Sequence, residues 1–266
     1  MRTAIKTFLL LLLPLLFSCS NNEVTCRYEL IAHAGGAIDG NIYTNSREAM
    51  EQAADKGYRF IEIDLAMTAD SVLVAAYSWE QFNEISGYAC KRDTAPTLQE
   101  FLSRRIYGRY TPITADDICA FFLANKNLTL VTDKISDADV LERYFAPIKS
   151  RMMVEAFTHS DYITLQGRGF GKVLYSCLAT DIDETLLKHL LLHRLFGDKI
   201  ETLALHTSAV DYPAFKIIDA LCDYRVALFT INDTTEIPEA LKKRIDYIYT
   251  DTIIDSFSTN LRSGIL

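Results

Sequence analysis

Short apolar segments alternate with helix-like segments along nearly the whole chain of 266 residues, and this alternation restricts the fold more than any other feature. Eight of the apolar segments have the pattern of buried strands: 28–33, the first half of 58–77, 128–132, 152–156, 172–177, 201–205, 225–230 and 247–250. Helical patterns lie at 45–56, from 137, near 162, at 183–196, at 210–222 and from 237. Eight such units predict an α/β protein with a closed (β/α)8 barrel, a TIM barrel, rather than an open doubly wound sheet.

Two segments depart from the simple alternation. Residues 72–77 return after a short turn near Asp70, too soon for a crossover, so we expect a β-hairpin on the second strand, with Tyr77 opposite Ile63. Residues 78–127 lack a clear barrel strand and are expected to form a helical insertion. Within it, two helix starts carry the pattern of a capping box, Thr97–Glu100 and Thr114–Asp117.

The N-terminus has the pattern of an export signal. Two basic residues precede an apolar run, Phe8–Phe17, that is too short to span a bilayer, and Ser18 follows it. The segment Leu16-Phe17-Ser18-Cys19 also resembles a bacterial lipobox, which implies cleavage before Cys19 and a lipid on its sulfur. We therefore expect a signal peptide at 1–18, a tether at 19–27, a barrel domain at 28–266 and a membrane-anchored lipoprotein of the bacterial cell envelope. A periplasmic or secreted protein is the alternative.

Charge and cysteine content exclude several classes of function. Removing residues 1–18 takes away two of the 27 basic residues and none of the 35 acidic ones, so the mature chain has a net charge of −10. This balance argues against a nucleic-acid partner. Apart from Cys19, the five cysteines are widely spaced and include no Cys-x-x-Cys pair, which argues against a zinc ribbon. One or two disulfides remain open, although burial as small apolar residues is expected for Cys177 and Cys222.

Two carboxylates lie two residues apart on the second predicted strand. Because side chains alternate along a strand, Glu62 and Asp64 point to the same face of an otherwise apolar run. Two buried acids side by side repel each other, so a cation is expected between them, and oxygen ligands suit Mg²⁺ or Ca²⁺. An edge strand with an acidic solvent face is the alternative.

Other polar residues stand at the ends of the remaining predicted strands. In a (β/α)8 barrel the carboxyl ends of the strands surround the active site, so these residues are expected to meet there. A metal bound by three carboxylates keeps positions open for phosphate and water, and His33 is then placed to move a proton or attack phosphorus. The residues at the strand ends are His33, Glu62 and Asp64, Asp133 and Lys134, Glu155, His206, Asn232 and Asp251.

Several short motifs, taken together, resemble the glycerophosphodiester phosphodiesterase family, which belongs to the phosphatidylinositol-phospholipase-C-like superfamily. The likeness runs in order over residues 28–252, nearly the whole mature chain. It rests on Ile31-Ala-His-Ala-Gly-Gly36, Asn45-Ser-Arg-Glu-Ala49, Phe60-Ile-Glu-Ile-Asp64, Thr68-Ala-Asp70, Pro96-Thr-Leu-Gln-Glu100, Phe229-Thr-Ile-Asn232 and Tyr249-Thr-Asp251.

The resemblance implies a metal held by Glu62 and Asp64, with Asp133 as the best match for a third carboxylate. It also implies that His33 is one of two catalytic histidines. The family's second histidine lies in a His-Asp pair at the end of the hairpin's return arm, where this chain has Tyr77-Ser78.

Three further positions depart from the family pattern. This chain has Ala34 where the family has Arg and Thr44 where the family has Glu, and Lys134 directly follows its carboxylate instead of standing two residues away.

Three interpretations follow from these departures. In an active enzyme, Tyr77 or a rim group such as His206 replaces the missing histidine; a slow, lyase-like enzyme uses His33 alone; a pseudoenzyme binds metal or a phosphodiester without turnover. We predict a divalent-metal-dependent phosphodiester hydrolase of the glycerophosphodiester phosphodiesterase type, with a small-molecule phosphodiester or a lipid headgroup as its partner. Lys134, Gly35, His206 and Trp79 are the candidate substrate contacts, Trp79 either as an apolar lip or as part of a packed cluster.

Overall fold

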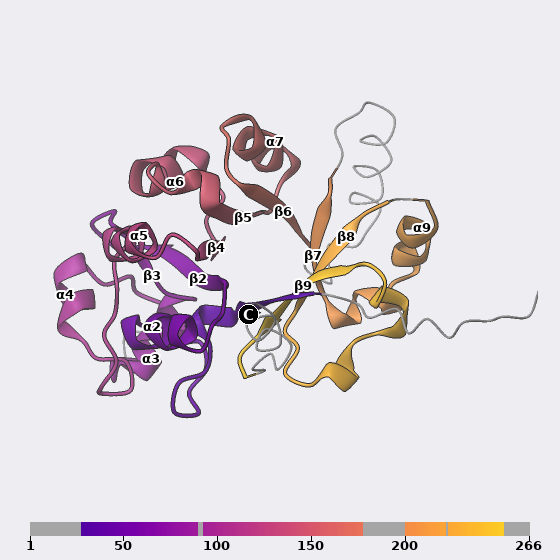
Figure 1. Ribbon diagram of the computed structural model, residues 1–266. Helices are drawn as coiled ribbons and strands as arrows, with labels where there is room; N and C mark the ends of the chain where they lie inside the picture. Colours follow the sequence, from indigo (N-terminus) through magenta and orange to yellow (C-terminus); the bar gives the residue numbers. More distant parts are fainter. Residues whose placement is uncertain (1–27, 90–92, 178–199, 222, 253–266) are drawn as a thin grey trace, which may run out of the picture.

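The computed structural model describes residues 28–89, 93–177, 200–221 and 223–252 (Figure 1). Within these residues, eight parallel strands close into a barrel, because β1 pairs with β9 on one side and with β2 on the other. The predicted (β/α)8 barrel is thereby confirmed. The strands are β1 (Glu29–Ala32), β2 (Phe60–Met67), β4 (Thr129–Asp133), β5 (Met152–Ala156), β6 (Lys172–Cys177), β7 (Thr202–His206), β8 (Arg225–Phe229) and β9 (Ile245–Thr250).

The strands are apolar on both faces, as parallel barrel strands must be, because one face lines the interior and the other is covered by helices. Alternate residues of the strands fill the barrel as a separate cluster, made of Ile31, Val131, Met153, Leu174, Ala204, Ala227 and Tyr249. The residues between them pack outward against the helices in a larger cluster. At the carboxyl ends the inward positions change from apolar to polar, which places the polar groups at one mouth.

The hairpin has the predicted register. β3 (Leu73–Ala75) pairs antiparallel with β2, with Leu65 opposite Ala75 and Met67 opposite Leu73. The same register, continued by the Ala76 N–H bond to the Asp64 carbonyl, sets Tyr77 opposite Ile63.

The predicted helical insertion contains α3 (Trp79–Ile85), α4 (Leu98–Ser103) and α5 (Ala115–Ala124). Both capping boxes are confirmed, since Thr97 pairs with Glu100 and Thr114 with Asp117 at the starts of α4 and α5. Figure 1 shows these helices on the same side of the barrel as β2 and β3.

Most of the predicted barrel helices are present within the described residues. They are α2 (Arg47–Asp55), α6 (Ala138–Phe145), α7 (His159–Gly167) and α9 (Pro213–Leu221). The prediction of a helix from Ile237 is wrong: two short 3-10 turns, Thr234–Glu236 and Glu239–Leu241, replace it. Pro238 stands between them, and a proline disfavours the helical conformation of the residue before it. The predicted helix 183–196 lies outside the described residues.

Two cysteines, Cys119 and Cys177, are buried in the described part of the chain. Cys177 lies in β6, as predicted, whereas Cys222 lies outside the described residues. A search of the described helices for a segment with the length and apolarity of a membrane span found none.

The loop after β1 is packed tightly against α2 at Gly35. This glycine has a φ of +83°, and a Cβ there would lie 3.0 Å from the Ala49 Cβ and 3.2 Å from the Met50 nitrogen. Gly40 provides a comparison, because its φ is +80° but its Cβ would meet nothing within 4 Å. The predicted substrate contact at Gly35 is therefore also a position where close packing requires glycine.

We expect Gly40→Ala to lower the free energy of unfolding by about 1 kcal/mol, the cost of a left-handed backbone for alanine. Gly35→Ala should lower it by about 1–3 kcal/mol more, because the added methyl also overpacks the contact with α2. Urea denaturation of both variants measures the difference. Equal losses at the two positions would show that the contact with α2 is not tight.

Candidate active site

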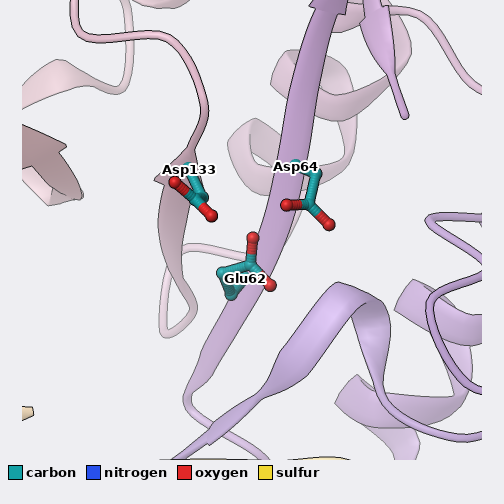
Figure 2. A group of neighbouring side chains, drawn as sticks. All are labelled: Glu62, Asp64 and Asp133. Carbon is teal, nitrogen blue, oxygen red and sulfur yellow. The ribbon is translucent and has the colours of Figure 1, made fainter. Parts of the chain in front are cut away.

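Three carboxylates from two adjacent strands face one another at the carboxyl end of the barrel (Figure 2). Glu62 and Asp64 lie on β2, and the parallel register sets Asp133 of β4 opposite Asp64. One oxygen from each of the three lies within 4.8 Å of the others. Glu62 and Asp64 are each only 1% exposed. The structure therefore brings together the three residues that were predicted to bind a metal.

Two neighbouring groups hold the β2 carboxylates in place. The Ala34 N–H donates to Glu62 Oε2 at 2.7 Å. The Asn45 side chain donates to Asp64 Oδ2 at 2.9 Å and accepts the Asp64 backbone N–H at 2.9 Å. Ala34 and Asn45 both have left-handed backbones, with φ of 49° and 48°, so the loop before α2 is bent to reach the acids. Asn45 was part of a recognised motif, but its contact with Asp64 depends on the fold.

Burial and mutual repulsion make this group of acids unfavourable when it carries no cation. Burial, followed by the Asp64 and Asp133 charges, raises the pKa of Glu62 well above its usual value. Burial and then Asp133 raise the pKa of Asp64 to about 6. Glu62 Oε1 is also buried, with no hydrogen-bond partner among the residues that the structure describes. An all-oxygen site with an unsatisfied oxygen fits a hard divalent cation such as Mg²⁺ or Ca²⁺, which would supply both the missing contact and the missing charge.

Lys134 lies against the same acids. Its Nζ is 2.9 Å from Asp133 Oδ2, 3.9 Å from Asp64 Oδ1 and 4.4 Å from the centre of the Tyr77 ring. Burial opposes its charge, but Asp133 and Asp64 outweigh burial and raise the pKa of the ammonium. A φ of 71° at Lys134 turns the chain back toward the carboxylates directly after β4. This local turn lets a lysine adjacent to Asp133 reach the site despite its unusual spacing.

Beside the β2 acids, directly after β1, His33 is held by a carboxylate. His33 Nδ1 is 3.0 Å from Asp251 Oδ1, and the two side chains are 12% and 4% exposed. Asn232 donates to Asp251 Oδ2 at 2.8 Å and accepts the Asp251 N–H at 2.8 Å. Burial opposes ionisation of Asp251, but the hydrogen bonds from His33 and Asn232 outweigh it and lower the pKa. Since Nδ1 is engaged by Asp251, Nε2 is the nitrogen left to exchange a proton with a ligand.

Two tyrosines stand beside this histidine. The Tyr43 ring meets the His33 ring edge-on with centroids 4.4 Å apart, and it meets the Tyr77 ring at 5.1 Å. Tyr77, which was predicted to be catalytic, is exposed. Ser78, at the other position of the family's His-Asp pair, caps α3 by accepting the Gln81 N–H. Tyr43 was not recognised from the sequence, because no motif marked it.

The remaining predicted site residues are His206, Trp79 and Cys19. Neither His206 nor Trp79 has a contact with the three carboxylates among the interactions of the described residues. His206 ends β7 at the same mouth, and its Nδ1 accepts the Ser208 N–H at 3.2 Å. Trp79 packs against Phe82 and Phe101 of the insertion, which is the packed cluster given as the alternative to an apolar lip. Cys19 lies outside the described residues.

Below the mouth, Tyr249 donates a hydrogen bond of 2.5 Å to the buried Glu155. Burial, and then the charge of Asp133, raises the pKa of Glu155 to about 8. A mostly protonated Glu155 therefore adds little to the negative charge of the mouth at neutral pH.

The pH dependence of stability tests the strain at the acidic cluster. A carboxyl with a raised folded pKa contributes stability below its unfolded pKa and loses it as pH rises through the folded pKa. Without metal, Asp64→Asn should therefore match the wild type near pH 4 and be more stable by about 2 kcal/mol at pH 8, as judged by urea denaturation. Added Mg²⁺ or Ca²⁺ should stabilise the wild type and remove this advantage.

Asp70→Asn is the matched control for that measurement. Hydrogen bonds from Thr68 and from the Leu98 N–H lower the pKa of Asp70. This variant should lose stability relative to the wild type as pH rises, which is the opposite trend. A gain for Asp64→Asn that is equally large at pH 4 and pH 8 would contradict the raised pKa.

The chain resembles known proteins in its fold. No protein-family model matches the chain, and no curated protein does. Solved structures do match, among them a glycerophosphodiester phosphodiesterase from Parabacteroides distasonis, with 20% identity, a TM-score of 0.60, and coverage of 89% of this chain and 97% of the other. The enzyme of the same name from Thermotoga maritima matches with 17% identity, a TM-score of 0.61, and coverage of 88% and 98%.

A phosphodiesterase from Oleispira antarctica, determined in complex with the product sn-glycerol-3-phosphate, matches with 18% identity, a TM-score of 0.57, and coverage of 84% and 92%. The resemblance indicated by the sequence motifs is thus confirmed in the fold. This chain has the (β/α)8 barrel of the glycerophosphodiester phosphodiesterases over nearly its whole described length.

Proposed function

We propose that this protein is a divalent-metal-dependent phosphodiesterase that hydrolyses a glycerophosphodiester or a related small phosphodiester. The observation that carries the proposal is the convergence of Glu62, Asp64 and Asp133 beside a histidine held by Asp251. The similar Oleispira antarctica structure contains sn-glycerol-3-phosphate as product, which supports a glycerol-containing substrate for this chain.

The proposed mechanism divides the work between two neighbouring groups of residues, the three carboxylates with Lys134 and the pair of His33 and Asp251. A divalent cation bound by the three carboxylates would neutralise charge on the phosphate and polarise its oxygens. His33 Nε2 takes the proton from the attacking water, and Asp251 stabilises the imidazolium that results. Lys134, next to the carboxylates, offers a second positive charge for the phosphate. Gly35 and His206 remain predicted substrate contacts, whereas Trp79 lies in the packed cluster of the insertion.

A second candidate function is binding of a phosphodiester without turnover. Two observations favour it: Tyr77-Ser78 stands where the family has His-Asp, and the Lys134 ammonium lies against two of the three carboxylates. Loss of a proton-transferring group costs about 10²- to 10⁴-fold in rate, so turnover requires another group in that role.

We also propose that the protein is exported and anchored by a lipid on Cys19, which supports a lipid headgroup as the source of its phosphodiester. A fatty-acid analogue added to expressing bacteria should label the wild type and not Cys19→Ala, and the variant should leave the membrane fraction. Cys26→Ala is the control and should stay labelled. A labelled Cys19→Ala would place the lipid on another residue, and an unlabelled wild type would favour plain secretion.

The hydrolase is tested with glycerophosphodiesters and with bis(p-nitrophenyl) phosphate in the presence of Mg²⁺, Ca²⁺ or Mn²⁺. The wild type should be active with at least one ion and inactive in EDTA. His33→Ala should lower kcat by about 10²- to 10⁴-fold because the group that takes the proton from water is lost. A wild type that binds the ion, as seen by calorimetry, but hydrolyses neither substrate would favour the binding protein. Analysis of the products for a cyclic phosphate identifies a lyase-like reaction.

A separate experiment tests whether Asp251 orients His33. The same substitution is made at Asp251, directly after β9, and at Asp246, near the start of β9. Asp251→Asn should lower kcat and shift the acidic limb of the pH profile, because the His33 ring loses its charged partner. Asp246→Asn removes only an ion pair with Arg225, near the opposite end of the strand, and should leave activity unchanged. Equal activity of the two variants would remove Asp251 from the mechanism.

A further inference from the structure

Tyr43 has a backbone conformation that its own side chain does not favour. Its φ is 55°, in the left-handed region where a residue with a Cβ is destabilised by about 1–2 kcal/mol. The carbonyl of Tyr43 is tied to the insertion by a hydrogen bond of 2.9 Å from Gln81 Nε2. Strained residues of this kind persist where the surrounding structure enforces them, and they concentrate at functional sites.

The enforced conformation directs the Tyr43 ring into the mouth. The ring is half-buried and packs edge-on against His33, with 4.4 Å between centroids. Among the described residues, its hydroxyl has no hydrogen-bond partner. The O–H is therefore available to a bound ligand on the side of the mouth where His33 presents its ring.

The charges around Tyr43 keep its hydroxyl protonated. Burial is the largest cause, and the charges of Asp251 and Asp64 follow, together raising the pKa to about 12. These carboxylates belong to the two halves of the site, one beside His33 and the other beside Asp133. The Tyr43 ring, which contacts both the His33 ring and the Tyr77 ring, thus carries a protonated hydroxyl.

The proposed reaction needs such a donor. When water attacks phosphorus and His33 takes its proton, the alcohol leaves as an alkoxide unless a second group protonates it. Two other phenols lie nearby. Tyr249 already donates its O–H to Glu155, and Tyr77 is exposed, with its ring face covered by the Lys134 ammonium at 4.4 Å. Tyr43 instead contacts His33 directly.

We propose that Tyr43 is the second proton-transferring residue of this site and protonates the leaving alcohol. The inference rests on the proposed hydrolysis. As the bond from phosphorus to the leaving oxygen breaks, the Tyr43 O–H proton passes to that oxygen and gives the free alcohol. The water oxygen bonds to phosphorus, and its proton goes to His33 Nε2. Proton transfer from the imidazolium through solvent then restores the tyrosine.

Dependence on the leaving group provides the test. An alkoxide requires protonation, whereas p-nitrophenolate is a stable anion that leaves without it. Tyr43→Phe, which keeps the ring, should lower kcat about 10²-fold or more for glycerophosphoethanolamine and change kcat for bis(p-nitrophenyl) phosphate by only a few-fold. Thermal unfolding of the variant checks that the fold is kept, and a purely structural role would not separate the two substrates.

Two matched variants complete the experiment. Tyr107→Phe, at an exposed tyrosine of the insertion, should leave both activities unchanged. Tyr77→Phe should keep the wild-type ratio between the two substrates; if it shows the selective loss instead, Tyr77 is the donor and the inference is overturned. Equal effects of Tyr43→Phe on both substrates, or no effect, also overturn it while the proposed function stands. A wild type inactive on both substrates overturns both proposals.

Discussion

Repulsion among carboxylates gathered at one mouth of the barrel is the constraint on which this site depends. Glu62, Asp64 and Asp133 approach within 4.8 Å, and two of them are almost completely buried. In such a place, charged oxygens cost far more free energy than they do in water unless cations and hydrogen-bond donors compensate them. Backbone and side-chain donors supply part of that compensation and Lys134 supplies a charge. Glu62 Oε1, however, has no hydrogen-bond partner in the described part of the chain. Without a further cation, the arrangement keeps negative charge that nothing compensates.

The loops around the mouth supply what the strands cannot. The barrel strands set the backbone positions of the acids. The Ala34 N–H and the Asn45 amide reach these acids only because both residues adopt left-handed backbones. After β8 and β9, on the other flank of β1, Asn232 and Asp251 form a second set of contacts that orients His33. The two sets converge on the space beside Tyr43 and Tyr77. Strain in these loops is offset by the rigid barrel beneath them, which is how such sites keep unfavourable conformations.

The sequence was sufficient to predict most of the barrel and its three clustered carboxylates. Predictions failed where the local structure depended on one particular contact. The period-two pattern of β2 was sufficient to set Glu62 and Asp64 on one face, and the strand count was sufficient to predict closure. The helix expected from Ile237 was wrong because Pro238 divides the segment into two 3-10 turns. Tyr43 carried no pattern at all, since its position beside His33 follows from a strained loop and from Gln81, 38 residues away.

By itself, the sequence determined the alternation of strands and helices, the hairpin register, the capped helices of the insertion, and the carboxyl ends at which polar residues gather. These are local properties, decided by side-chain periodicity and by hydrogen bonds within a few residues. Only the tertiary structure decided which residues meet across the mouth: Asn45 with Asp64, Asp251 with His33, Lys134 with Tyr77, and Tyr43 between the two halves. Those contacts join residues far apart in the chain, and barrel closure together with loop conformation sets them.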